Sequence, residues 1–278
     1  MILEQSLAFL VNWFANPSFA EMGLAVLIGI IWYAAYVPPL RGYGFVWGVA
    51  AAAAVLTLLA VVFIQIPLQL LTGQLLAETL DPATITKWLY VLGLPQILLS
   101  GFVQEGAKLL PVVVVWQRAE HYLDPKVGLI VGAAAGLGFG VFEARWALNQ
   151  AVAGGLTWSA VQTGGFQTFL PVWERIFAVG GHIAFSALAG YGLARERGWL
   201  FYLIAAGLHS AMNYTVVLLQ AQLISIVTLE ILAALVAIAA AAWALVLRHT
   251  GEPAPWAGTG YRRRLHLGKE PKEYISKQ

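Results

Sequence analysis

Five polar side chains that could carry out hydrolytic chemistry interrupt long apolar stretches of this chain. They are two glutamates, two histidines and an asparagine: Glu105, Glu143, His182, His209 and Asn213. A carboxylate paired with an imidazole can take a proton from a water molecule and orient it for attack. A second imidazole with an amide can stabilise an oxyanion. Together these groups are the parts needed to hydrolyse an amide bond.

The chain around these residues is too apolar for a soluble protein. Of its 278 residues, 60% are hydrophobic and 11% are charged, whereas a soluble domain carries about 25% charged residues. The apolar residues form blocks of about 20 or more, which is long enough to cross a bilayer as helices. We therefore predict an all-α, polytopic transmembrane bundle. The absence of cysteine excludes disulfides, thiolate nucleophiles and cysteine-based zinc sites.

About seven spans are predicted from the apolar blocks. They lie at residues 20–37, 45–71, 88–116, 128–150, 172–194, 200–220 and 224–247. Pro95 and Gly101 predict a kink or two stacked half-helices in the third span. Residues 2–15 are predicted to form an interfacial helix. The chain then divides into a transmembrane bundle, residues 1–248, and a flexible basic cytoplasmic tail, residues 249–278.

The distribution of basic residues predicts the orientation of the bundle. An odd number of spans places the two termini on opposite sides of the membrane. With the C-terminus inside, twelve of the 16 lysines and arginines fall in inside segments, as the positive-inside rule requires. We therefore predict an outside N-terminus and an inside C-terminus.

The five polar residues share one depth in the predicted bundle. Each lies about 9 to 15 residues from the inner end of its span, or about 14 to 23 Å at 1.5 Å per residue. The helices alternate in direction, so this agreement does not follow from sequence spacing alone. Ionisable residues inside a membrane usually face the bundle interior and have a function. We expect one shared interior site.

Neighbouring residues could support this site. Lys108 lies three positions after Glu105, on the same helix face, and can pair with it. Ser186 lies one turn after His182.

Three glycines predict close helix packing beside the site. Gly132, Gly136 and Gly140 are spaced by four, the small-xxx-small pattern that lets two backbones approach. Such packing would bring Glu143, on the same helix, toward a neighbouring helix.

Other polar residues are predicted to lie apart from the site. Arg145, Glu174 and Arg175 fall near the outer ends of spans, where charged side chains anchor helices at the interface. Glu230 falls inside the last span without an evident partner.

Zinc is an alternative that the residue types leave open. Two histidines with one or two glutamates form an acceptable zinc set, and the ligands would then be Glu143, His182 and His209. The sequence has no His-Glu-x-x-His pair. We therefore expect no metal cofactor, with zinc as the alternative.

Four stretches, in order and each on its own predicted span, resemble a known family. They are Gln104-Glu105-Gly106-Ala107-Lys108, similar to a Glu-Glu-x-x-Lys motif; Phe139-x-x-x-Glu143, a Phe-x-x-x-Glu motif; Glu174-Arg175 followed by Gly181-His182-Ile183-Ala184-Phe185-Ser186; and His209-Ser210-Ala211-Met212-Asn213, a His-x-x-x-Asn motif. The pattern resembles the PrsW/YhfC-like branch of the CAAX-protease and bacteriocin-processing superfamily of glutamic intramembrane proteases. The family-like core is about residues 88–220.

The resemblance implies a role for each matched residue. Glu105 would help to activate water, with Glu143 and His182 around it, and His209 and Asn213 would support the oxyanion.

Gln104 takes the place of the first glutamate of the Glu-Glu motif. A glutamine can hold a water molecule but cannot accept its proton.

The leading hypothesis is an intramembrane endopeptidase that cleaves a membrane protein or peptide with water activated by glutamate and histidine. A non-catalytic scaffold that binds a partner membrane protein is the first alternative, because the scaffold subunit of gamma-secretase, APH, distantly resembles the same regions. A proton-coupled transporter is the second. We expect a multi-pass protein of a prokaryotic plasma membrane, in contact with lipid and without a nucleic-acid partner.

Overall fold

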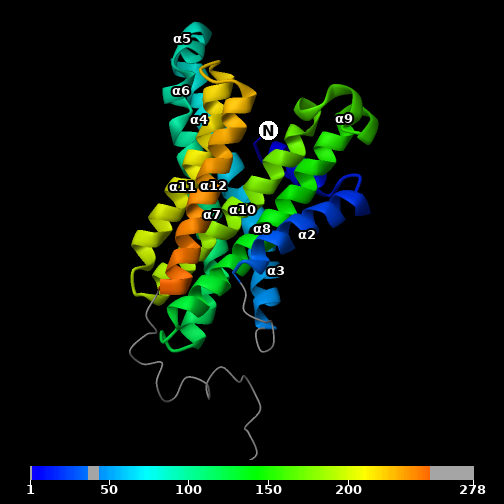
Figure 1. Ribbon diagram of the computed structural model, residues 1–278. Coiled ribbons are helices and arrows are strands. Elements are labelled where there is room, and N and C mark those ends of the chain that lie inside the picture. The colour runs from blue at the N-terminus through cyan, green and yellow to red at the C-terminus, as the bar shows by residue number, and fades with distance from the viewer. Residues whose placement is uncertain (1, 37–43, 251–278) are drawn as a thin grey trace, which may run out of the picture.

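The computed structural model describes residues 2–36 and 44–250, and every regular element in these two ranges is a helix (Figure 1). The predicted all-α class is confirmed for this part of the chain. The predicted tail lies outside the described residues from position 251 onward.

Six helices are long and apolar enough to cross a membrane. The first, Phe45–Thr79, is continuous and consists of α3 (Phe45–Ala60), a π-helical turn η1 (Val61–Gln65) and α4 (Ile66–Thr79). The others are Leu89–Arg118, which holds α6 (Leu89–Leu92) and α7 (Leu94–Arg118), then α8 (Pro125–Ala153), α10 (Phe166–Ala194), α11 (Gly198–Gln220) and α12 (Ile226–Thr250). Each coincides with one of the last six predicted spans, so the chain is a multi-pass membrane protein. Its orientation across the membrane stays a prediction.

The first predicted span, 20–37, corresponds to a shorter helix. α2 (Phe19–Ala34) has 16 residues, about 24 Å of helix at 1.5 Å per residue, less than the hydrocarbon core of about 30 Å. It reaches spanning length only together with α1 (Ile2–Phe14), from which it is bent by 90°. Asn16 lies at this corner with a φ of 46°, the left-handed conformation that asparagine tolerates. The described residues therefore hold six spans, or seven if the bent pair crosses as one.

The predicted interruption of the third span lies just before α7. The span breaks at Gly93, between α6 and α7, and Pro95 stands in the first turn of α7. Proline is tolerated there because the N–H that it lacks would have no helical partner. Gly101 lies within uninterrupted helix, so it does not produce the kink that the sequence suggested.

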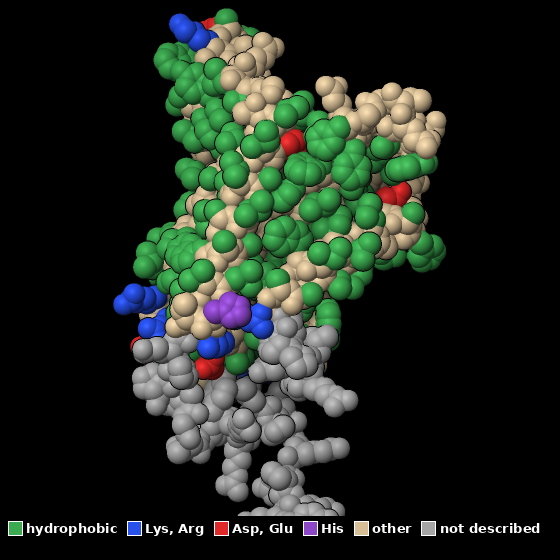
Figure 2. Space-filling model, in the orientation of Figure 1, with side chains coloured by type: hydrophobic (Ala, Val, Ile, Leu, Met, Phe, Trp, Pro, Cys, Tyr) green, Lys and Arg blue, Asp and Glu red, His purple; other side chains and the backbone are tan. Residues whose placement is uncertain are grey.

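Two short helices mark one end of the bundle, which we call the α9 end. α5 (Pro82–Lys87) and α9 (Trp158–Gly164) both lie at this end (Figure 1). α8 ends there, and α10 and α12 begin there. Hydrophobic side chains cover the middle of the face shown in Figure 2, with lysine and arginine gathered at its lower end and present at its upper tip, as expected of a surface in contact with lipid.

α8 and α10 form the buried centre of the bundle, and they make the most extensive helix contact within the described residues. Glycines allow this approach. A Cβ at Gly132 would collide with the backbone oxygen of Ser186, and a Cβ at Gly136 would collide with that of His182. This is the close packing that the glycine spacing predicts, and it holds the α8 residues that follow against α10.

Candidate functional site

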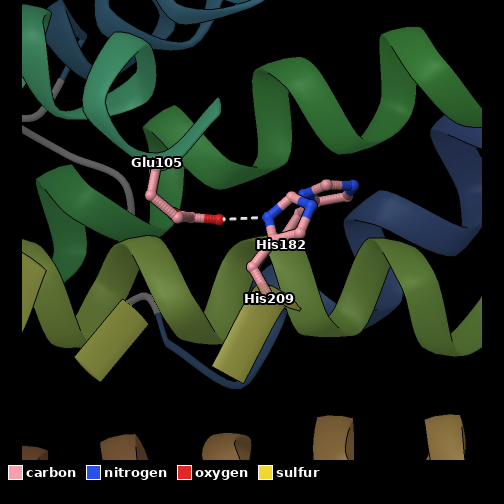
Figure 3. A group of neighbouring side chains, drawn as sticks. All are labelled: Glu105, His182 and His209. Atoms are coloured by element: carbon pink, nitrogen blue, oxygen red, sulfur yellow. Dashed lines mark hydrogen bonds and ion pairs between the residues drawn. The ribbon is translucent and has the colours of Figure 1, made fainter. Parts of the chain in front are cut away.

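Four helices bring two glutamates and two histidines into one buried cluster. α7 supplies Glu105, α8 supplies Glu143, α10 supplies His182 and α11 supplies His209. Figure 3 shows Glu105, His182 and His209 pointing toward one another, and one nitrogen or oxygen from each of these three lies within 4.8 Å of the others. Glu143 Oε2 lies 2.9 Å from His182 Nε2. The structure therefore brings together four of the five residues that the sequence places at one depth.

Glu105 is held by three donors. Its Oε1 accepts hydrogen bonds from Lys108 Nζ at 2.5 Å and from His209 Nδ1 at 2.7 Å, and its Oε2 accepts one from Ser186 Oγ at 3.2 Å. The side chains of Glu105 and Lys108 are both fully buried. With both oxygens bonded and no exposed surface, Glu105 acts as the fixed anchor of the cluster.

His182 lies between a cation and a carboxylate, and these partners define its tautomer. Its Nδ1 is 3.0 Å from Lys108 Nζ, and its Nε2 faces Glu143. An ammonium group can only donate, so Nδ1 accepts and Nε2 carries the hydrogen that is donated to Glu143. An ionised carboxylate can only accept, so His209 Nδ1 donates to Glu105. His209 Nε2 then has no hydrogen bond to any residue that the structure describes.

Glu143 differs from Glu105 in having a free oxygen and exposed surface. Its side chain is 21% exposed, against 0% for Glu105. Its Oε2 accepts from His182 and, at 3.3 Å, from Nη1 of Arg175. Its Oε1 is hydrogen-bonded to none of the described residues. Glu143 therefore offers an open acceptor beside His182, where a water molecule can bind.

Asn213 and Gln104 lie outside this network. Asn213 Nδ2 donates to Ser100 Oγ at 3.1 Å, which links α11 to α7. Gln104 Nε2 donates to Gln65 Oε1 at 3.1 Å, on η1. Its own Oε1 is buried without a partner among the described residues. Neither side chain is hydrogen-bonded to the cluster, so no direct contact supports the roles that the resemblance implies for them.

Arg175 belongs to the site, although sequence reasoning placed it among interfacial anchors. Besides its bond to Glu143, its guanidinium pairs with the adjacent Glu174. Arg175 precedes His182 by seven residues, or two helical turns, so both lie on one face of α10. This spacing, together with the place of Arg175 in the third stretch that resembles the family, is the signal that could have identified it.

Two further residues were predicted to lie apart from the site. Arg145 is buried and donates to the backbone oxygen of Trp13, so it fixes α1 against α8 instead of anchoring a helix at the interface. Glu230, on α12, is 5% exposed, and its Oε2 is buried without a hydrogen-bond partner among the described residues.

The fold and the cluster together define the class: a multi-pass helical membrane protein that buries two glutamate–histidine pairs and a lysine inside its bundle.

A comparison with known protein families matches residues 43–244, more than half of the chain, to the family described as "PrsW family intramembrane metalloprotease". The chain belongs to this family. The matched range is wider than the predicted core at 88–220, because it includes the first long helix and most of α12. No curated protein and no solved structure matches this chain.

The family description raises the question of whether these residues fit a metal ion. Glu105, His182 and His209 offer one carboxylate and two imidazoles, a donor set that catalytic zinc accepts. The set contains Glu105 where the sequence suggested Glu143. Lys108 already bonds atoms of two of these residues, Glu105 Oε1 and His182 Nδ1. The donors therefore fit a metal ion by type, and a bound ion would compete with the lysine ammonium for them.

Proposed function

We propose that this chain is an intramembrane endopeptidase that hydrolyses a peptide bond in or near the bilayer, with a water molecule activated by Glu143 and His182. The observation that carries the proposal is the pair of contacts inside the bundle, 2.9 Å between Glu143 and His182 and 2.7 Å between Glu105 and His209. Membership of a family of membrane proteases supports it. The family resemblance in the sequence supports a glutamic mechanism.

Glu143 is the better general base of the two glutamates. A base must lie within hydrogen-bond reach of the water whose proton it takes. Glu143 has a free oxygen and is partly exposed, whereas Glu105 has both oxygens bonded and is fully buried. We therefore assign the base to Glu143. Glu105, which the resemblance suggested for water activation, orients His209 and balances the charge of Lys108.

The reaction step follows from these contacts. Glu143 Oε1 takes a proton from water while the water oxygen bonds to the peptide carbonyl carbon. The proton then passes to the amide nitrogen as the C–N bond breaks, which gives a carboxylic acid and an amine. His182 donates to the other oxygen of Glu143 and holds the carboxylate in place throughout.

His209 is the candidate for oxyanion stabilisation. Its Nδ1 is bonded to Glu105. As an imidazolium, the ring would present Nε2–H to the tetrahedral intermediate, where a positioned donor is effective. Asn213 would have to leave Ser100 to reach the same place, so we assign this role to His209.

A metal ion held by Glu105, His182 and His209 would supply a Lewis acid and lower the pKa of a bound water molecule. The roles assigned to Glu143 and Arg175 rest on their own contacts, so they are the same whether or not such an ion is bound.

The experiment is cleavage of a quenched-fluorescence peptide with one membrane-spanning segment, by the purified full chain in liposomes. Glu143→Gln should lower kcat by about 100- to 10,000-fold, the usual effect of losing a general base. Glu21→Gln is the matched control, because Glu21 is also a buried glutamate, on α2 and outside the cluster. Equal cleavage by wild type, Glu143→Gln and Glu21→Gln would refute the proposal.

The position in the membrane and the class of substrate are part of the same proposal. The apolar helices support a multi-pass position, the basic residues favour a C-terminus inside, and the family resemblance and compact loops favour a prokaryotic plasma membrane. The substrate would be a membrane protein or a membrane-inserted peptide.

A further inference from the structure

The guanidinium group of Arg175 is hydrogen-bonded to two carboxylates, those of Glu143 and Glu174. Its Nη1 donates to Glu143 Oε2 at 3.3 Å, and its Nε and Nη2 both donate to Glu174. The Arg175 side chain is 13% exposed. The pairing with Glu174 alone would balance its charge. The bond to Glu143 is therefore additional, and it reaches the carboxylate that we assign as the base.

The two donors on Glu143 act on the same atom. His182 and Arg175 both donate to Oε2, which leaves Oε1 unbonded within the described residues. With two donors on one oxygen, the carboxylate cannot rotate freely. The free oxygen is then always the same one, and it keeps one direction. Without Arg175 only one hydrogen bond would hold the group, and either oxygen could turn toward the water.

We propose that Arg175 is a positioning residue that fixes the orientation of Glu143. This inference rests on the proposed function, since it concerns the base of that reaction.

The test measures kcat and KM of purified full-length variants in liposomes, with the same quenched peptide. Arg175→Gln should lower kcat by about 10- to 100-fold, as the loss of a group that orients a catalytic side chain does, with KM changed by less than about twofold. Arg175→Lys should recover part of kcat because a cation is retained.

Arg145→Gln is the matched control. Arg145 is also a buried arginine in a span, but it bonds a backbone oxygen of α1 and no carboxylate of the cluster. This variant should lower Tm and keep kcat within about twofold of wild type. A folded Arg175→Gln variant with wild-type kcat, or one that changes only KM, would overturn the inference.

A second readout does not depend on cleavage. Tm losses of Glu143→Gln and Arg175→Gln should be non-additive in the double variant, since the two groups share a bond, and additive losses would count against the contact.

If Glu143→Gln retains wild-type cleavage, the proposed function fails. If Glu143→Gln is inactive and Arg175→Gln is fully active, the function stands and only the positioning role of Arg175 fails.

Discussion

A single methyl group added to α8 should displace the helix that carries Glu143. Gly136 lies against α10, where a new Cβ would be 2.6 Å from the carbonyl carbon of His182 and 2.7 Å from Cα of Ile183, and would collide with the oxygen of His182. All of these are backbone atoms, which cannot move aside as the end of a side chain can. The substitution Gly136→Ala must therefore push α8 and α10 apart.

The size of the displacement follows from these distances. Carbon atoms in contact are normally about 3.5–4.0 Å apart, so the two backbones must separate by about 1 Å. The hydrogen bond of 2.9 Å between Glu143 and His182 would lengthen to about 3.9 Å, beyond the range of a hydrogen bond. Overpacking of this kind costs about 1–3 kcal/mol of stability. A misplacement of about 1 Å at a reacting group lowers a rate by about 100-fold.

Two other glycines provide a graded control. A Cβ at Gly140 would lie 3.1 Å from Cβ of His182, so a shift of a few tenths of an ångström would suffice. A Cβ at Gly207, on α11, would meet nothing within 4 Å. Tm in detergent and cleavage rate in liposomes should therefore fall most in Gly136→Ala, less in Gly140→Ala and not at all in Gly207→Ala. An order of effects that does not follow these contacts would refute the reasoning, as would a Gly136→Ala variant that behaves like Gly207→Ala.

Three further predictions concern the effect of Lys108 on metal binding, the residue at position 104, and the cavity beside Trp158. Because Lys108 bonds two of the three possible metal ligands, a chelator should leave cleavage by wild type unchanged; loss of activity that zinc restores would show a metal enzyme instead. Gln104→Glu should not raise activity, because residue 104 bonds Gln65 and not the cluster, whereas a rise of tenfold or more would support the scaffold alternative for the wild type. A photo-crosslinker at Trp158, which with α2 and α10 lines an apolar cavity of about 490 Å³, should label lipid or the substrate peptide. Trp199, equally exposed but at the start of α11, should not label the peptide.

The arrangement of the site could be predicted from the sequence because a membrane restricts the fold so strongly. Polar backbone groups must be satisfied within helices, so a count of residues along each span gives the depth of every side chain. Glu105, Glu143, His182 and His209 share that depth, and they meet in the structure. Depth is therefore a good guide to which residues can share a site.

Depth does not give the direction in which a side chain points. Asn213 lies one turn after His209 at a similar depth, yet its amide donates to Ser100. Gln104 precedes Glu105 by one position, which turns it about 100° around the helix toward Gln65. Both rotations depend on which neighbour each helix face meets, and one sequence does not contain that information.

Side-chain length explains why depth alone placed Arg175 outside the site, although Glu174-Arg175 is part of the third stretch that resembles the family. It lies about one turn farther from the inner end of its span than Glu143 does, so depth alone placed it at the interface. Its long side chain covers this difference and reaches Glu143 at 3.3 Å. A search that allowed arginine to reach one turn, and that checked the seven-residue spacing to His182, would have included it.

The composition of the buried network indicates that the network serves catalysis and not stability. Stability does not require it, because replacing buried ion pairs by apolar residues is often neutral or stabilising. The network nevertheless gathers Lys108 and Arg175 with the carboxyl groups of Glu105 and Glu143 inside the bundle. If Lys108 served only to neutralise Glu105, it would need no second contact, yet it also bonds His182 and thereby fixes the tautomer that donates to Glu143. Each basic group thus reaches, directly or through one imidazole, the partly exposed carboxylate of Glu143, whose Oε1 is hydrogen-bonded to none of the described residues, which is the arrangement that a general base requires.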